Sequence, residues 1–204
     1  LTYHLASPNA IDLYIHMKSQ NDYLAYEALL ANYFDLALKP QFCVSESNFD
    51  KSHQAIQWYT PIVEHQHKDN ALIFPRNAQT AQLHRDGRWS NVKSIYQWKT
   101  HHYYAHPIAV QIHPEHNIAV ALMTHPETCP SFSWTIGIAD MHHSSYGSDH
   151  LDDPQKARNP LYPSLFGHDL HTSKQYTAHI RLAVIPTDPQ MSNIQTAYDT
   201  FLSA

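Results

Sequence analysis

The chain has 204 residues, of which 43% are hydrophobic and 15% are charged, and this balance excludes a disordered chain. Its formal net charge of −5 argues against non-specific nucleic-acid binding, which needs a basic surface. No run approaches the roughly 18 consecutive apolar residues of a membrane span, so we expect no membrane partner. No signal peptide is visible, and the compartment stays open between cytoplasm and periplasm.

The first residues are expected to pair as two strands. Residues 2–7 form the shorter strand, and Ser7, Pro8 and Asn9 have the chemistry of a hairpin turn. In residues 10–17 apolar and polar side chains alternate, as they do in a half-buried strand. The apolar face of this second strand consists of Ile11, Leu13, Ile15 and Met17.

The middle of the chain is expected to form short strands separated by polar segments. Residues 21–38 favour a helix by propensity. A strand across 26–34 is the competing interpretation, preferred once the resemblance described below is weighed. Residues 57–60, 71–74 and 96–105 are rich in strand-forming side chains, and residues 78–83 fit one helical turn.

A hairpin is predicted from 107–111 and 118–123, because residues 113–117 have the composition of a turn. Residues 139–172 are polar and interrupted by prolines, which predicts a long loop of the kind that is usually functional or disordered. Residues 177–185 form the best strand of the chain. Ser192 is the expected N-cap of a closing helix, whose apolar face consists of Ile194, Ala197, Tyr198 and Phe201.

These elements together predict an all-β fold, mainly antiparallel, of the β-sandwich or supersandwich type with a short C-terminal helix. Residues 1–204 are read as one β-sandwich domain, with the alternative that it is the C-terminal part of a larger supersandwich. Cys43 and Cys129, the only cysteines, fit no zinc-binding spacing. They form either one disulfide or two buried free thiols.

The order of these features resembles the galactose-mutarotase-like β-supersandwich, and within it a group of bacterial proteins linked to sugar metabolism. The similar pieces include Tyr26-Glu-Ala, Asp86-Gly-Arg-Trp89, Ser133-Trp134 and the strand from Tyr176 to Pro186. The resemblance implies a sugar ligand in a cleft on the concave face. The histidine acid and glutamate base that aldose 1-epimerases of this fold use have no motif that can be placed in this chain, so an epimerase- or lyase-like activity stays open.

A sugar site is expected where aromatic and polar side chains gather, because flat rings complement the C–H faces of sugars. The ring-bearing candidates are Trp58, Tyr59, Trp89, Trp98, Tyr103, Tyr104, Trp134 and Tyr146. Trp134 and Trp98 are preferred because each lies beside histidine-rich sequence, with His106, Arg76 and Arg88 as further ligand-binding candidates. His125 and His142 are the catalytic candidates, since proton transfer on a sugar needs a positioned acid or base.

Two other interpretations compete with a sugar-modifying protein. One is a non-catalytic binding or structural module of a larger glycan-handling protein. The other is a metal-dependent enzyme, because imidazoles and carboxylates in the segment 140–153 suit a divalent metal, with His143, Asp149 and His150 as ligands. The sugar, the reaction and the oligomeric state are not determined by the sequence.

Overall fold

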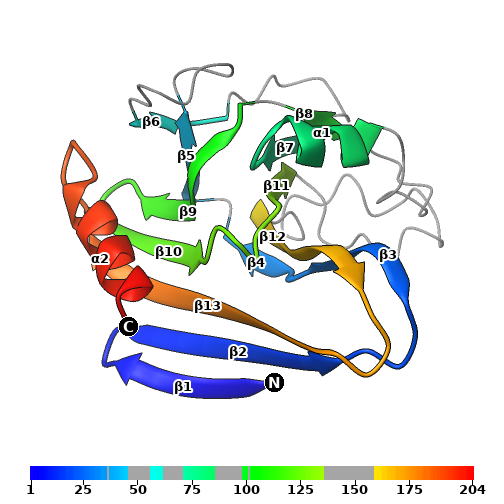
Figure 1. Cartoon of the computed structure of the whole chain (residues 1–204). Helices are drawn as coiled ribbons and strands as arrows, with labels where there is room; N and C mark the ends of the chain where they lie inside the picture. The colour runs from blue at the N-terminus through cyan, green and yellow to red at the C-terminus, as the bar shows by residue number, and fades with distance from the viewer. Residues whose placement is uncertain (36, 46–55, 62–70, 86–97, 101, 136–158) are drawn as a thin grey trace, which may run out of the picture.

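The computed structural model describes the chain except residues 36, 46–55, 62–70, 86–97, 101 and 136–158. The described residues form a sandwich of two β-sheets with a short helix near each sheet (Figure 1). The predicted all-β fold with a short C-terminal helix is therefore confirmed. Neither described helix is long and apolar enough to cross a membrane.

The larger sheet has seven strands, each antiparallel to its neighbours. The N-terminal hairpin forms one edge of this sheet. The C-terminal strand pairs with that hairpin, so the first and last strands of the chain lie in the same part of the sheet. In spatial order the strands are β1 (Thr2–Ser7), β2 (Ala10–Lys18), β13 (Gln175–Pro186), β10 (Ile118–Thr124), β9 (Tyr104–His113), β5 (Lys39–Ser45) and β6 (Ile56–Tyr59).

The smaller sheet has six strands and one parallel pair, β7 with β8. Its strands in order are β3 (Tyr23–Leu29), β12 (Asn159–Leu170), β11 (Ser131–Thr135), β7 (Ala71–Pro75) and β8 (Trp98–Thr100), and β4 (Asn32–Phe34) pairs with β12 beside this path. The strand interpretation of residues 26–34 is confirmed, with a break between β3 and β4. The helical turn predicted at 78–83 is part of α1 (Ala78–Arg85).

The core between the sheets is built from the alternating inward faces of the strands. Leu13, Ala178 and Ile180 contribute from the larger sheet, and Leu13 lies on the apolar face that the sequence predicted for residues 10–17. Phe42 on β5 and Phe74 on β7 join the two layers directly, because their rings stack with centroids 4.0 Å apart. Ile11 departs from the apolar face expected for residues 10–17, since it is 43% exposed.

Helix α2 (Ser192–Leu202) covers the opposite, outer face of the larger sheet (Figure 1). Its buried residues Ile194, Tyr198 and Phe201 pack there on the side chains of β9, β10 and β13. Cys43 points to this outer layer and Cys129 to the inner core, and both are buried free thiols. Of the two alternatives for the cysteines, the structure shows the unpaired one.

Two expectations about local structure were wrong. Residues 159–170 belong to β12 and not to a loop, although Pro160 and Pro163 lie in them. Pro163 is tolerated because β12 changes partner there, from β4 at residues 159–161 to β3 from Ser164 onward. The N-cap of α2 is Met191 with φ 59°, and the Ser192 hydroxyl donates to Asp188 at 2.8 Å.

The backbone conformation and the close packing at position 167 on β12 both require glycine. Replacing Gly167 therefore tests this packing. It has φ +64°, and an added Cβ would lie 2.5 Å from Pro130 Cγ. We expect Gly167→Ala to lower the free energy of unfolding by about 1–2 kcal/mol, from left-handed backbone strain and overpacking. Chemical denaturation measures this loss.

The matched control for Gly167→Ala is Ala25→Gly, because Ala25 also has positive φ, at 48°. Glycine adopts this conformation without steric cost, so we expect Ala25→Gly to be neutral or to stabilise by up to about 1 kcal/mol. Equal denaturation midpoints for Gly167→Ala and the parent protein would contradict the packing of Pro130 on Gly167.

Candidate functional site

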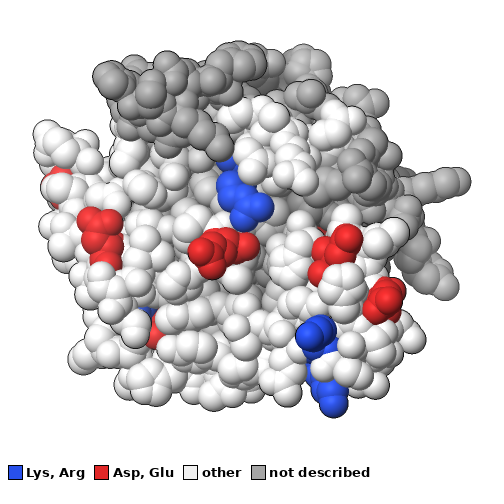
Figure 2. All heavy atoms as spheres, viewed as in Figure 1, with Lys and Arg blue, Asp and Glu red and all other residues white. Residues whose placement is uncertain are grey.

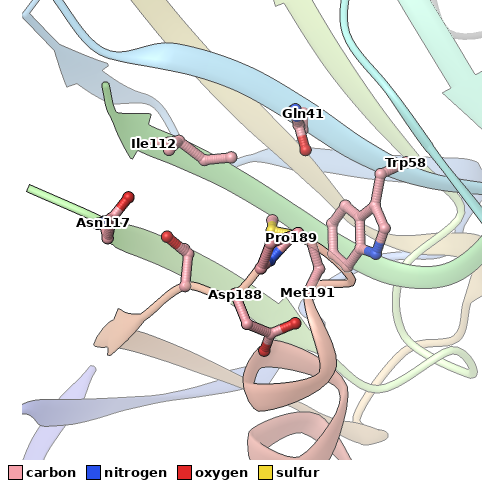
Figure 3. Close-up of a pocket in the computed structure, with 8 residues that line it drawn as sticks. Gln41, Trp58, Ile112, Asn117, Asp188, Pro189 and Met191 are labelled. Carbon is pink, nitrogen blue, oxygen red and sulfur yellow. The ribbon is translucent and has the colours of Figure 1, made fainter. Parts of the chain in front are cut away.

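A hollow of about 580 Å³ opens on the outer side of the larger sheet, beside the first turn of α2. We call it the Trp58 hollow. Four separate parts of the chain supply its walls: β5, β6, the β9–β10 hairpin and the corner between β13 and α2. The lining residues are Gln41, Trp58, Ile112, Asn117, Thr187, Asp188, Pro189 and Met191. Figure 3 shows Trp58 beside Pro189 and Met191, Gln41 on the opposing strand and Asn117 at the other end.

Local backbone geometry fixes one end of the Trp58 hollow. Asn117 has φ 50°, a left-handed conformation that asparagine tolerates at the end of a turn. Its carbonyl accepts the N–H of Thr187 at 2.7 Å, which ties the β9–β10 hairpin to the end of β13. The side chains of Asn117 and Thr187 are thereby held on neighbouring segments.

Asp188 shapes the other side of the Trp58 hollow by capping α2. Its carboxylate accepts the N–H of Asn193 at 3.0 Å and of Gln190 at 2.9 Å, besides the hydroxyl of Ser192. These hydrogen bonds, that from Asn193 first, lower the pKa of Asp188 to about 2. In Figure 3 the carboxylate points towards the helix. Asp188 is thus an ionised structural group that positions Pro189 and Met191, not a proton donor.

The lining groups combine one aromatic face with neutral hydrogen-bonding groups. The half-buried Trp58 indole offers a flat apolar surface, and the amides of Gln41 and Asn117 can both donate and accept hydrogen bonds. Among the described lining residues none is Lys, Arg, His or Glu. Such walls suit a neutral ligand that has both an apolar face and hydroxyl groups.

The catalytic candidate His125 and the ligand candidate His106 lie outside the Trp58 hollow. Both face α2: the ring centroid of His125 is 4.8 Å from that of Phe201, and that of His106 is 5.3 Å from that of Tyr198. Burial lowers the pKa of each imidazole, for His125 with a further contribution from the charge of His179. The structure therefore brings these two histidines under the helix and not beside a sugar cleft.

Three further described candidates lie on the smaller sheet or at its border. Trp134 lies on β11 and Trp98 on β8. Arg76 donates to the carbonyl of Pro126 at 2.8 Å, which uses its guanidinium to hold the turn after β10. None of these three residues lines the Trp58 hollow.

The other candidates, Arg88, His142, His143, Asp149 and His150, fall outside the described residues. Within the described part of the chain, no three His, Cys, Asp or Glu side chains are grouped to hold a metal ion. On the face seen in Figure 2, charged side chains are scattered singly or in small groups among neutral ones. A metal site in 140–153 stays a prediction.

Sequence reasoning included Trp58 among the ring-bearing candidates but preferred other tryptophans. The available signal was the alternation in Gln57-Trp-Tyr-Thr60, which places Trp58 on the face opposite Tyr59. Comparison with protein-family models, curated proteins and solved structures gave no match for this chain. The resemblance to galactose-mutarotase-like proteins accordingly stays a prediction.

Proposed function

We propose that this protein is a carbohydrate-binding β-sandwich domain whose ligand lies against Trp58. The observation that carries the proposal is the combination of one indole face with the side-chain amides of Gln41 and Asn117 around one hollow. A sugar ring has an apolar C–H face that packs on an aromatic ring, and its hydroxyls pair with amides. The volume of about 580 Å³ lies within the usual range of small-ligand sites.

The walls favour binding over chemical conversion of the sugar. Proton transfer needs a group that can change its protonation near neutral pH. The only ionisable side chain among the described lining residues is Asp188, whose pKa of about 2 keeps it ionised. We therefore propose a non-catalytic module, in line with the interpretation of the chain as a non-catalytic binding or structural module of a larger glycan-handling protein.

Trp58→Ala is expected to weaken sugar binding at least about tenfold, because aromatic anchors commonly contribute more than about 1.4 kcal/mol. The measurement is calorimetric titration with glucose, galactose, mannose, N-acetylglucosamine and glucuronate. We expect the neutral sugars to bind more tightly than glucuronate, since no described lining side chain is cationic.

The control for Trp58→Ala is Tyr3→Ala, because Tyr3 is a 70% exposed aromatic residue on β1, away from the Trp58 hollow. Its affinities should equal those of the parent protein. Absence of binding by any sugar of the panel, or equal loss in both variants, would overturn the proposed function.

A further inference from the structure

Helix α2 joins two different features of the outer face. At its start, Met191 and the preceding Asp188 and Pro189 line the Trp58 hollow. At its end, Tyr198 and Phe201 are fully buried against histidines of the larger sheet. One 11-residue helix thus lies between these histidines and the wall of the hollow.

The histidines under the helix form what we call the imidazole layer: His106 on β9, His125 directly after β10 and His179 on β13. The Phe201 ring is central to it, with centroids 4.8 Å from His125 and 4.6 Å from His179. The ring centroids of His125 and His179 lie 5.6 Å apart. Two imidazoles on strands and one directly after a strand thus contact two buried aromatic side chains of one helix.

Two charged side chains beside the imidazole layer, Arg181 and Asp12, already pair with each other when the imidazoles are neutral. Arg181 donates to both oxygens of Asp12, at 2.6 and 2.8 Å, and its guanidinium carbon lies 5.1 Å from the Phe201 ring centre. His179 Nε2 lies 3.2 Å from Asp12 Oδ2 and stacks on Tyr14 with centroids 4.2 Å apart.

The carboxylates that face the other two imidazoles are more weakly placed. The charge of Asp199 on α2 raises the pKa of His106, and that of Glu127 raises the pKa of His125, but in both cases less than burial lowers it. The backbone of His106 also contacts the buried Cys43 thiol, whose pKa burial raises to about 12, so this thiol stays neutral. Added protons on His106 and His125 would therefore place positive charges beside Tyr198 and Phe201, and Arg181 already lies over the Phe201 ring.

We propose that proton binding by His106 and His125 of the imidazole layer loosens helix α2 and thereby weakens ligand binding in the Trp58 hollow. The ligand half of this proposal rests on the proposed function, whereas the helix half does not. The chemistry is like-charge repulsion beneath an apolar helix end, which histidines produce between about pH 7 and 5.

The direction of the pH dependence follows from burial. The lowered pKa values of His106 and His125 mean that the folded protein binds these protons less tightly than the unfolded chain does. Their neutral forms thus support the fold fully above the ordinary pKa of 6.5. This support declines as the pH falls from there through the lowered native pKa values.

Amide hydrogen exchange of the full chain tests the helix half, at about pH 7.5 and about pH 5.5 with correction for intrinsic exchange rates. We expect the protection of the amides of Ile194–Leu202 to fall at least about threefold more than that of β12 on acidification. The variant His106→Gln/His125→Gln should lose this difference. The control variant His168→Gln/His171→Gln, changed at exposed histidines of the β12–β13 hairpin, should retain it.

Equal changes in protection for α2 and β12 in the parent protein would overturn the helix half, even if the double variant fails to fold. Titration of the tightest-binding sugar of the panel at both pH values tests the ligand half. We expect at least about threefold weaker binding at the lower pH. Unchanged affinity overturns the coupling, whereas absence of binding at about pH 7.5 overturns the proposed function and leaves the exchange result to decide the helix half.

Discussion

Phe42→Ala is expected to lower the free energy of unfolding by about 4 kcal/mol, the largest effect of any single substitution considered for this protein. Phe42 is 1% exposed and stacks on Phe74, which is fully buried, at a centroid distance of 4.0 Å. Truncation removes the ring that joins the two sheets and leaves a cavity that rigid strands on both sides cannot fill. For a chain of this size the loss corresponds to roughly 10 °C in Tm.

The measurement for Phe42→Ala is equilibrium denaturation in urea, followed by tryptophan fluorescence and by circular dichroism. Leu24→Ala is the control, because Leu24 is 84% exposed on β3 and should change stability by less than about 0.5 kcal/mol. A loss below about 1 kcal/mol for Phe42→Ala would show that the sheets are not joined through this stacked pair.

Glu27→Gln is expected to stabilise the protein by about 2–3 kcal/mol at alkaline pH. Glu27 on β3 is half-buried, and the Ser164 hydroxyl donates to its Oε1 at 2.6 Å. Burial raises the pKa of Glu27 from 4.5 to about 7, against the opposing effect of that hydrogen bond. Each pKa unit corresponds to about 1.4 kcal/mol, and glutamine keeps the acceptor for Ser164 while it removes the buried charge.

The sign follows from linkage. Because its native pKa is raised, the carboxyl binds its proton more tightly in the folded protein than in the unfolded chain. Its contribution to stability is full below about pH 4.5 and is lost as the pH rises through about 7. The advantage of Glu27→Gln should therefore be largest at about pH 8 and shrink towards pH 5. This trend is opposite to that of the imidazole layer, so the two effects can be measured separately.

Urea denaturation across this pH range measures the effect of Glu27→Gln. The control is Glu115→Gln, at an exposed position of the β9–β10 turn, which should leave the pH profile unchanged. If Glu27→Gln destabilises the protein at every pH, the carboxylate is favourably paired in the fold and its burial does not dominate.

Periodicity predicted the strands whose side chains alternate between a buried and a solvated face. Residues 177–185 were predicted for this reason, whereas the hairpin of β9 and β10 was predicted from the turn composition of residues 113–117. β12 was missed because it is buried along most of its length and contains two prolines. A strand covered on both faces has no alternation, and the change of partner that admits Pro163 is a tertiary feature.

The Trp58 hollow could not be predicted because its walls are distant in sequence. Gln41 and Trp58 come from β5 and β6, Asn117 from a turn, and Asp188 from the corner before α2. Only the sheet order, which places β10 and β9 between β13 and β5, brings these segments together. Sequence reasoning favoured histidines and rings that are close along the chain, such as His125, which directly follows β10 of the larger sheet, and Trp134, which lies on β11 of the smaller sheet.

Proton–nitrogen correlation spectra of the side-chain N–H groups test the central proposal most directly, because they observe the lining groups themselves. On addition of a neutral sugar, we predict that the indole N–H of Trp58 and the amide groups of Gln41 and Asn117 shift together and saturate at one concentration. The indole signals of the other tryptophans should stay in place. Saturable shifts at Trp98 or Trp134 with Trp58 unchanged, or no shift with any neutral sugar, would contradict a sugar site at the Trp58 hollow.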